Sequence, residues 1–178
     1  MAKLDTKNAE ILFSEEQLQA RVKELGAQIA KDYEGEDLLL VGILKGSVPF
    51  MADLMRAIPL EGLTIDFMQV SSYGGGTTTS GQIKISKDLG THIEGKNVLI
   101  VQDIVDTGLT LRNLKQLLLA RNPKSLKICT IMDKPSRRRV ELVPDYRGFE
   151  VDDLFIVGYG LDYDQLYRNL PYISWIKE

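Results

Sequence analysis

Acidic, hydroxyl-bearing and glycine residues gather directly after an aliphatic run in the middle of the chain. Residues 98–101 read VLIV, and the sequence QDIVDTGLT follows over residues 102–110. The aliphatic run is typical of a buried β-strand, and leucines spaced at three and four then predict a helix over residues 110–121. The first N–H groups of a helix lack intrahelical partners and carry partial positive charge, so they attract a phosphate. The segment therefore predicts a phosphate-monoester site between a strand and a helix.

Two threonines, a glycine and two carboxylates give this segment its chemistry. Thr107 and Thr110 add hydroxyl donors, and Gly108 lets a ligand approach the backbone closely. Asp103 and Asp106 precede the helix and could move a proton or hold hydroxyl groups. The segment matches neither G-x-x-x-x-G-K-[ST] nor G-x-G-x-x-G, which argues against a P-loop or a dinucleotide site. A plain βα turn, in which Asp106 caps the helix, is the alternative interpretation.

Short aliphatic runs alternate with segments of helical spacing along the rest of the chain. Strands are expected at residues 38–44, 64–70, 82–85, 98–101, 126–132 and 154–157, and helices at 14–33, after Pro49 and at 110–121. The pattern predicts an α/β fold in a single domain, residues 1–178, with a mainly parallel sheet flanked by helices. Residues 71–81, SSYGGGTTTSG, are too rich in Gly, Ser and Thr to pack and predict a mobile loop.

The composition excludes several classes of function. The 178 residues include 22 Lys and Arg against 25 Asp and Glu, a net charge of −3, which makes nucleic acid an unlikely partner. With one cysteine and one histidine, the chain forms no internal disulfide and no multi-thiolate or two-histidine metal site. We expect Cys129 to be buried and His92 to lie in a surface loop. No apolar stretch approaches the ~20 residues of a membrane span, and no secretory signal is visible, so a cytoplasmic protein is expected.

Five segments resemble a known family. Residues 98–111, VLIVQDIVDTGLTL, resemble the phosphoribosyl pyrophosphate (PRPP) signature of type I phosphoribosyltransferases. The segments LVGILKGS (40–47), SSYG (71–74), ICTIMDKP (128–135) and LFIVGYGLDYDQLYRNLP (154–171) resemble, in order, those of hypoxanthine-guanine phosphoribosyltransferases. The resemblance implies transfer of the 5-phosphoribosyl group from PRPP to N9 of hypoxanthine or guanine, giving IMP or GMP and pyrophosphate in purine salvage.

The same resemblance implies further features of the molecule. It predicts a small hood over the base site and a lid loop over about residues 71–81, in which Ser72 and Tyr73 close over the reaction centre. It also implies Mg²⁺ as the cofactor and a homodimer or homotetramer as the assembly. The implied partners are small molecules, PRPP and a 6-oxopurine, and no membrane is involved.

The resemblance assigns roles around PRPP. The 5′-phosphate is held by Asp106, Thr107, Gly108, Leu109 and Thr110, the ribose by Gln102 and Asp103, and the pyrophosphate by Lys45, Gly46 and Arg168. The turn at Lys45 carries a non-proline cis peptide in this family. Asp162 matches a magnesium-site acid, to which Asp103 contributes indirectly.

The resemblance also assigns roles around the purine. Asp106 is the catalytic acid or base at N7, and the ammonium of Lys134 donates to O6, which disfavours adenine. Phe155 stacks on the ring, the backbone carbonyl of Ile156 meets the edge of the base, and Asp162 lies close by. Without the resemblance, Lys134 would be interpreted as an exposed lysine at a strand end and Phe155 as a core residue.

Gln102 departs from the family pattern, which has a glutamate before the aspartate. The amide carries no charge, so we expect retained catalysis with altered PRPP kinetics. Two other classes stay open: an RNA-binding regulator on the same fold and a non-catalytic nucleotide sensor. The basic run KPSRRR, residues 134–139, is expected to be a solvated turn, with a subunit contact or an RNA-facing patch as the alternatives.

Overall fold

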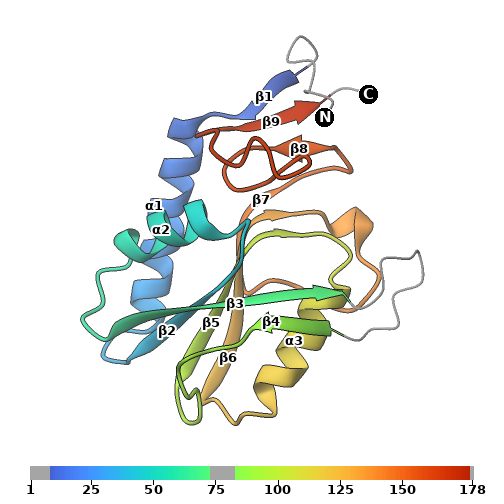
Figure 1. Ribbon diagram of the computed structural model, residues 1–178. Helices are drawn as coiled ribbons and strands as arrows, with labels where there is room; N and C mark the ends of the chain where they lie inside the picture. The colour runs from blue at the N-terminus through green and yellow to red at the C-terminus, as the bar shows by residue number, and fades with distance from the viewer. Residues whose placement is uncertain (1–8, 73–82, 177–178) are drawn as a thin grey trace.

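A six-stranded sheet runs through the middle of the molecule (Figure 1). The structure, a computed structural model, describes residues 9–72 and 83–176. The strand order is β4-β3-β2-β5-β6-β7, and only β3 and β4 pair antiparallel. The strands are β2 (Leu38–Ile43), β3 (Leu63–Ser72), β4 (Ile83–Lys87), β5 (Asn97–Val105), β6 (Ser125–Asp133) and β7 (Tyr146–Glu150). The predicted α/β fold with a mainly parallel sheet is confirmed.

Helices cover both faces of this sheet. Figure 1 shows α1 (Glu15–Asp32) and α2 (Val48–Ala57) on one face and α3 (Leu109–Leu119) on the other. The central strands are buried, and their side chains alternate between two apolar clusters. Leu38 and Leu40 pack with α1 and α2, whereas Leu39 and Val41 pack with α3. Successive strand residues point to opposite faces, so burial on both sides explains the continuous aliphatic runs.

The first helix begins where the sequence predicts. The Ser14 hydroxyl accepts a hydrogen bond from the Gln17 amide at 3.3 Å, and the Gln17 side chain accepts one from the Ser14 amide at 2.8 Å. This reciprocal pair is a capping box, which satisfies two amides that the helix itself leaves without partners. Pro49 lies in the first turn of α2, where its missing N–H has no consequence.

A second, three-stranded sheet forms the hood that the family resemblance implies. Its order is β1 (Ala9–Phe13), β9 (Ile173–Ile176) and β8 (Ile156–Val157), with antiparallel pairing. It lies at the top of Figure 1, where it brings strands from the two ends of the chain side by side. Residues of this hood and the ends of β5 and β6 line a common cleft, so the hood faces the carboxyl edge of the main sheet.

Several predicted boundaries are wrong. β5 continues to Val105, because β6 pairs with it as far as Asp133, so Gln102 and Asp103 belong to the strand and not to the loop. Ser71 and Ser72 belong to β3, since they pair with β4, and are not part of a loop. Tyr73 lies outside the described residues. The strand expected from residue 154 begins only at Ile156.

Three strands, β1, β7 and β9, were not predicted at all. Each has five residues or fewer and lies outside the longest aliphatic runs. Their pairing is decided by distant partners, as when Glu10 pairs with Trp175 across the two ends of the chain. Local periodicity carries too little signal for such short edge segments.

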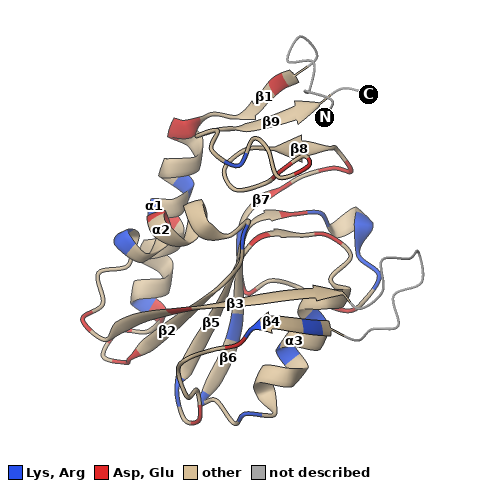
Figure 2. Ribbon diagram, in the orientation of Figure 1, with Lys and Arg blue, Asp and Glu red and all other residues tan. Residues whose placement is uncertain are grey.

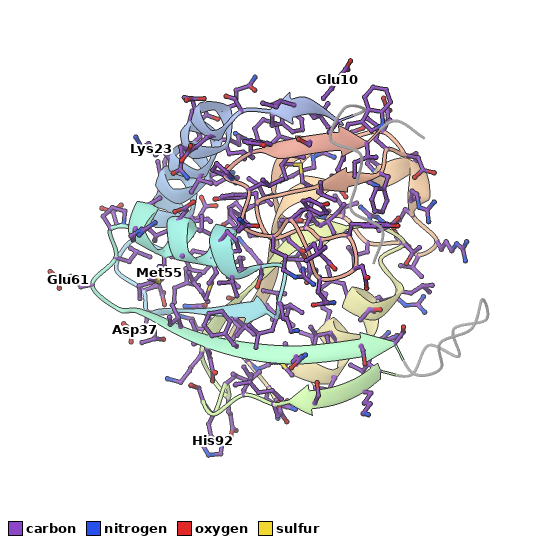
Figure 3. All side chains as sticks on the ribbon, turned by 45° about the horizontal axis from the view of Figure 1, so that its top comes forward. Glu10, Lys23, Asp37, Met55, Glu61 and His92 are labelled. Carbon is purple, nitrogen blue, oxygen red and sulfur yellow. The ribbon has the colours of Figure 1, made fainter. Side chains whose placement is uncertain are left out.

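The remaining expectations concern single residues and membranes. His92 is exposed at the edge of the molecule (Figure 3), as predicted. None of the helices among the described residues combines the length and the apolar character that a membrane span needs.

Cys129 gives a direct test of the packing between β5 and its neighbours. The thiol is fully buried in β6, and burial raises the pKa of the Cys129 thiol well above its usual range. Only the thiolate is nucleophilic, so we expect the folded protein to resist a thiol reagent at neutral pH. One thiol per chain should react after addition of denaturant, measured by thiol absorbance. Rapid labelling of the folded protein would contradict this packing.

Candidate active site

The strands β2 and β5 are parallel neighbours in the middle of the sheet, and the strand that follows each of them lies toward the opposite edge. β2 is followed by β3 on one side, and β5 is followed by β6 on the other. In open α/β sheets, ligands bind beyond the carboxyl ends of the strands at such a reversal. A cleft of about 450 Å³ lies at this position. It is lined by Ile43, Leu44, Gly46, Val70, Ser71, Ser72, residues 102–108, Thr110, Leu111 and Leu114.

The loop between β5 and α3 has the form of an anion site. Its Gly108 adopts φ +78°, a conformation that favours glycine, and precedes Leu109, the first residue of α3. The start of α3 therefore presents its amides towards the loop. The N-cap is Gly108, so the interpretation of Asp106 as the helix cap is wrong. Asp106 lies two residues further back, and its Oδ1 accepts a hydrogen bond from Arg137.

Gly46 makes the closest approach between the two strand ends. One residue earlier, the peptide bond between Leu44 and Lys45 is cis. A Cβ atom on Gly46 would lie 1.8 Å from Oδ2 of Asp103, and one on Gly160 would lie 1.9 Å from the Gly46 carbonyl oxygen. A side chain at Gly46 would have to displace the Asp103 carboxylate, and one at Gly160 would collide with backbone. The turn after β2, the end of β5 and the loop that follows β8 therefore lie in close contact around Gly46.

The Asp103 carboxylate is held in a protected environment. Its side chain is buried, and burial raises the pKa of the Asp103 carboxyl group, although the positive charge of Arg168 acts in the opposite direction. The Gln102 amide Nε2 donates a hydrogen bond to Asp103 Oδ1 at 2.8 Å. Gln102 thus supports the acid beside it, and both residues line the first cleft.

Arg168 lies in the segment after β8, close to the loop that contacts Gly46. Its guanidinium pairs with Asp162 at 2.8 Å and donates to the Gly160 carbonyl at 2.7 Å. The Nε atom is buried and has no hydrogen-bond partner among the described residues. Gln165, which the sequence did not single out, joins two predicted residues: its Oε1 accepts from Lys45 Nζ and from Arg168 Nη2, each at 3.3 Å. Two basic side chains thus converge near the Gly46 turn.

A second cleft, of about 530 Å³, shares Asp106 with the first. It is lined by Asp106, Lys134, Arg137, Asp153, Leu154, Phe155, Trp175 and Ile176. The Lys134 side chain is buried and donates to the Leu154 carbonyl at 2.6 Å, so the interpretation as an exposed lysine is wrong. Phe155 is 43% exposed and meets Tyr163 edge to face, so it is not a core residue.

The strand β8 places the next predicted residue. Ile156 is buried in this strand and pairs with Trp175 of β9. Trp175 itself lines the second cleft and was missed, although it is the single tryptophan of the chain and could have been noted for that reason. Asp153 was also missed, because the Asp152-Asp153 pair before a strand carries no distinctive pattern.

The basic run of residues 134–139 holds the loop that precedes α3. The Arg138 guanidinium donates to the Asp106 carbonyl and pairs with the buried Asp133, and the Arg139 amide donates to the Thr107 carbonyl at 3.0 Å. The run follows β6 (orange in Figure 1, blue in Figure 2). The expectation of a solvated turn is confirmed for Pro135, Ser136, Arg137 and Arg139, which are exposed, but Lys134 is buried and Arg138 is engaged with the βα loop.

The carboxylates of Asp103, in the first cleft, and of Asp162 can be compared with the needs of Mg²⁺. Asp162 pairs with Arg168, and Asp103 is buried against Gly46. Within residues 9–72 and 83–176, no group of three or more acidic, His or Cys side chains is placed to hold a metal ion. Magnesium in phosphate sites keeps several waters and takes one or two carboxylates together with substrate oxygens. The two separate acids fit an ion that arrives with a polyphosphate.

Comparison with known proteins agrees with this geometry. The family model described as "Phosphoribosyl transferase domain" matches residues 8–164. The chain therefore belongs to the phosphoribosyltransferase family.

Relatives within the family are more specific. A hypoxanthine-guanine phosphoribosyltransferase from Staphylococcus aureus is 54% identical over 168 residues, which cover 94% of this chain and 93% of the relative. The enzyme of that name from Bacillus subtilis is 53% identical over 167 residues, covering 94% and 92% of the two chains. A crystal structure of a hypoxanthine phosphoribosyltransferase from Staphylococcus aureus superposes with a TM-score of 0.93 and 51% identity, covering 99% of this chain and 96% of that one.

The contact between Gly46 and Asp103 can be tested by substitution. In Gly46→Ala, the new methyl group must displace the Asp103 carboxylate, and overpacking of this kind lowers the free energy of unfolding by about 1–3 kcal/mol. Thermal unfolding measures the loss. Gly90→Ala is the matched control, because a Cβ there lies 3.8 Å from its nearest neighbour, Asp66. Equal melting temperatures for Gly46→Ala and the parent would contradict the contact.

Proposed function

We propose that this protein transfers the 5-phosphoribosyl group of PRPP to N9 of a 6-oxopurine, hypoxanthine or guanine, and releases pyrophosphate. The observation that carries this proposal is the position of Asp106, which lines both clefts. One cleft has the helix start that a phosphorylated sugar needs, and Lys45 and Arg168 lie near the Gly46 turn that lines it. The other has an aromatic ring and a buried lysine, which suit a flat oxo-substituted base. The names of relatives that are 53–54% identical over 94% of the chain support the same activity.

In the first cleft, each part of PRPP meets its own group of residues. The loop and helix start from Asp106 to Thr110 receive the 5′-phosphate through amides and hydroxyls. Gln102 and Asp103 accept or donate hydrogen bonds to the ribose hydroxyls. Lys45, the Gly46 backbone and Arg168 bind the pyrophosphate, and the buried Nε of Arg168 supplies a donor that lacks a partner among the described residues.

In the second cleft, the purine is oriented by three contacts. Lys134, held by the Leu154 carbonyl, donates to O6 and discriminates against the amino group of adenine. Phe155 offers a ring face for stacking, and the Ile156 carbonyl meets the edge of the base next to Asp162. Asp106 exchanges a proton with N7 as N9 attacks C1 of the ribose, and its negative charge stabilises the developing positive charge on the sugar.

Magnesium and the β3 end complete the proposed site. Bound Mg²⁺ would neutralise the charge that develops on the leaving pyrophosphate. Asp162 would hold it directly and Asp103 indirectly. Ser72, at the end of β3, lines the first cleft, which supports its predicted role at the mouth of the site. By family resemblance, we further propose a homodimer or homotetramer that works in the cytoplasm.

The two competing functions have less support. An RNA-binding regulator would need free basic charge, but Arg137 and Arg138 pair with Asp106, Asp153 and Asp133. A non-catalytic sensor would not need an acid shared by the two clefts.

An activity assay tests the proposal. The protein is incubated with PRPP, Mg²⁺ and, in separate reactions, hypoxanthine, guanine, xanthine or adenine, and nucleoside monophosphate and pyrophosphate are measured. We expect turnover with hypoxanthine or guanine and none with adenine. Asp106→Asn, which keeps the shape of the side chain but loses its basicity, should lower kcat roughly 10²- to 10⁴-fold. Absence of turnover with every base, together with tight RNA binding, would overturn the proposal.

Gln102 gives a second functional prediction. In Gln102→Glu, a carboxylate replaces the amide, so the ribose hydroxyls gain a charge-assisted hydrogen bond and the KM for PRPP should fall about fivefold. The hydrogen bond to Asp103 is lost at the same time, so the free protein should be less stable. Steady-state kinetics and thermal unfolding measure the two effects. Gln116→Glu on the exposed face of α3 is the control for added charge, and unchanged PRPP kinetics in Gln102→Glu would refute the prediction.

A further inference from the structure

A single arginine bridges two carboxylates at the edge of the second cleft. Arg137 Nε lies 2.8 Å from Oδ1 of Asp106, and its Nη1 lies 3.1 Å from Oδ2 of Asp153. All three residues line this cleft. The guanidinium is planar and presents donors in fixed directions, so its contact with Asp153 also limits how it can meet Asp106.

The backbone of Arg137 is tied to the same part of the molecule. It ends a short 3₁₀ turn, Pro135–Arg137, and its amide donates to the Lys134 carbonyl at 3.1 Å. The Lys134 amide in turn donates to the Val105 carbonyl at 2.9 Å. Arg137 is therefore anchored both through its side chain, by Asp153, and through its backbone, next to the residue that precedes Asp106.

From this geometry we propose that Arg137 is a positioning residue for Asp106, and that Asp153 acts on Asp106 only by holding Arg137. The ion pair engages Oδ1 of Asp106, and in this proposal the other oxygen, Oδ2, is the one that meets the base. A carboxylate fixed at one oxygen loses rotational freedom before the reaction and not during it. The inference rests on the proposed function, since it gives Asp106 its substrate.

Arg137 is expected to affect the orientation of Asp106 more than the stability of the fold. The side chains of Arg137 and Asp106 are 40% and 43% exposed, and exposed ion pairs contribute little to stability. Arg138 differs, because its side chain is 13% exposed, forms an ion pair with the buried Asp133 and donates to the Asp106 carbonyl. Substitution of Arg137 should therefore change the reaction while the fold stays intact.

Four variants test the proposal in the full-length protein. Arg137→Ala should lower kcat with hypoxanthine roughly 10-fold, less than the 10²-fold that misplacement of a reacting group can cost, with an unchanged KM for PRPP. Arg137→Lys keeps the charge but not the planar fork, so it should recover part of the loss. Asp153→Asn should lower kcat less than Arg137→Ala does. The double variant should match Arg137→Ala alone, because Asp153 has no other route to Asp106 in this proposal.

Arg139→Ala is the matched control from the same basic run. Among the described residues, the structure gives the Arg139 side chain no ion pair, and the amide that donates to Thr107 is retained in the variant. We expect the parental kcat for Arg139→Ala and melting temperatures within about 3 °C for all the variants.

The outcomes separate the inference from the proposed function. A parent protein without turnover on any base overturns the proposed function itself. A parent that turns over while Arg137→Ala keeps its kcat overturns only the role of Arg137. That role is also overturned if the effects of Arg137→Ala and Asp153→Asn multiply in the double variant, or if Arg139→Ala loses as much activity as Arg137→Ala.

Discussion

The approach of Gly46 to the Asp103 carboxylate is the contact on which the geometry of the first cleft depends. Gly46 follows β2, Asp103 belongs to β5, and Gly160 closes on the Gly46 carbonyl from the loop after β8. A Cβ at Gly46 would meet the Asp103 carboxylate, and a Cβ at Gly160 would meet the Gly46 carbonyl oxygen, so glycine at both positions allows these close approaches. Lys45 and Arg168, from different parts of the chain, both contact Gln165 near this turn.

The acids of the two clefts are balanced one by one, although the whole chain has a net charge of −3. Arg168 pairs with Asp162, and Arg137 pairs with Asp106. Asp103 is buried, which raises the pKa of its carboxyl group and opposes the effect of the nearby Arg168. The Arg137–Asp106 pair is 40% and 43% exposed, so it contributes little to stability and its groups can exchange partners. The pairing of individual acids, and not the net charge of the chain, therefore sets the local charge of the clefts.

Prediction from the sequence succeeded where the signal is local. The capping box of α1, the buried β2 and the glycine before α3 follow from residue types and spacing within a few positions. It failed for β1 and β9, because short edge strands depend on a partner from the other end of the chain. For the basic run of residues 134–139 it gave the exposed turn but not the ion pairs, because the acidic partners of Arg137 and Arg138 cannot be identified from local sequence.

By itself, the sequence determined the α/β class, the strand–loop–helix start at residues 98–111 from which a phosphate site was predicted, and the residue types available for catalysis, since each depends on interactions between near neighbours. Only the tertiary structure decided that Asp106 lies between two clefts, that Lys134 is buried against Leu154, and that Arg137 meets Asp106. These relations join the ends of different strands and the hood. They arise from the packing of the sheet and the hood, which no local pattern encodes.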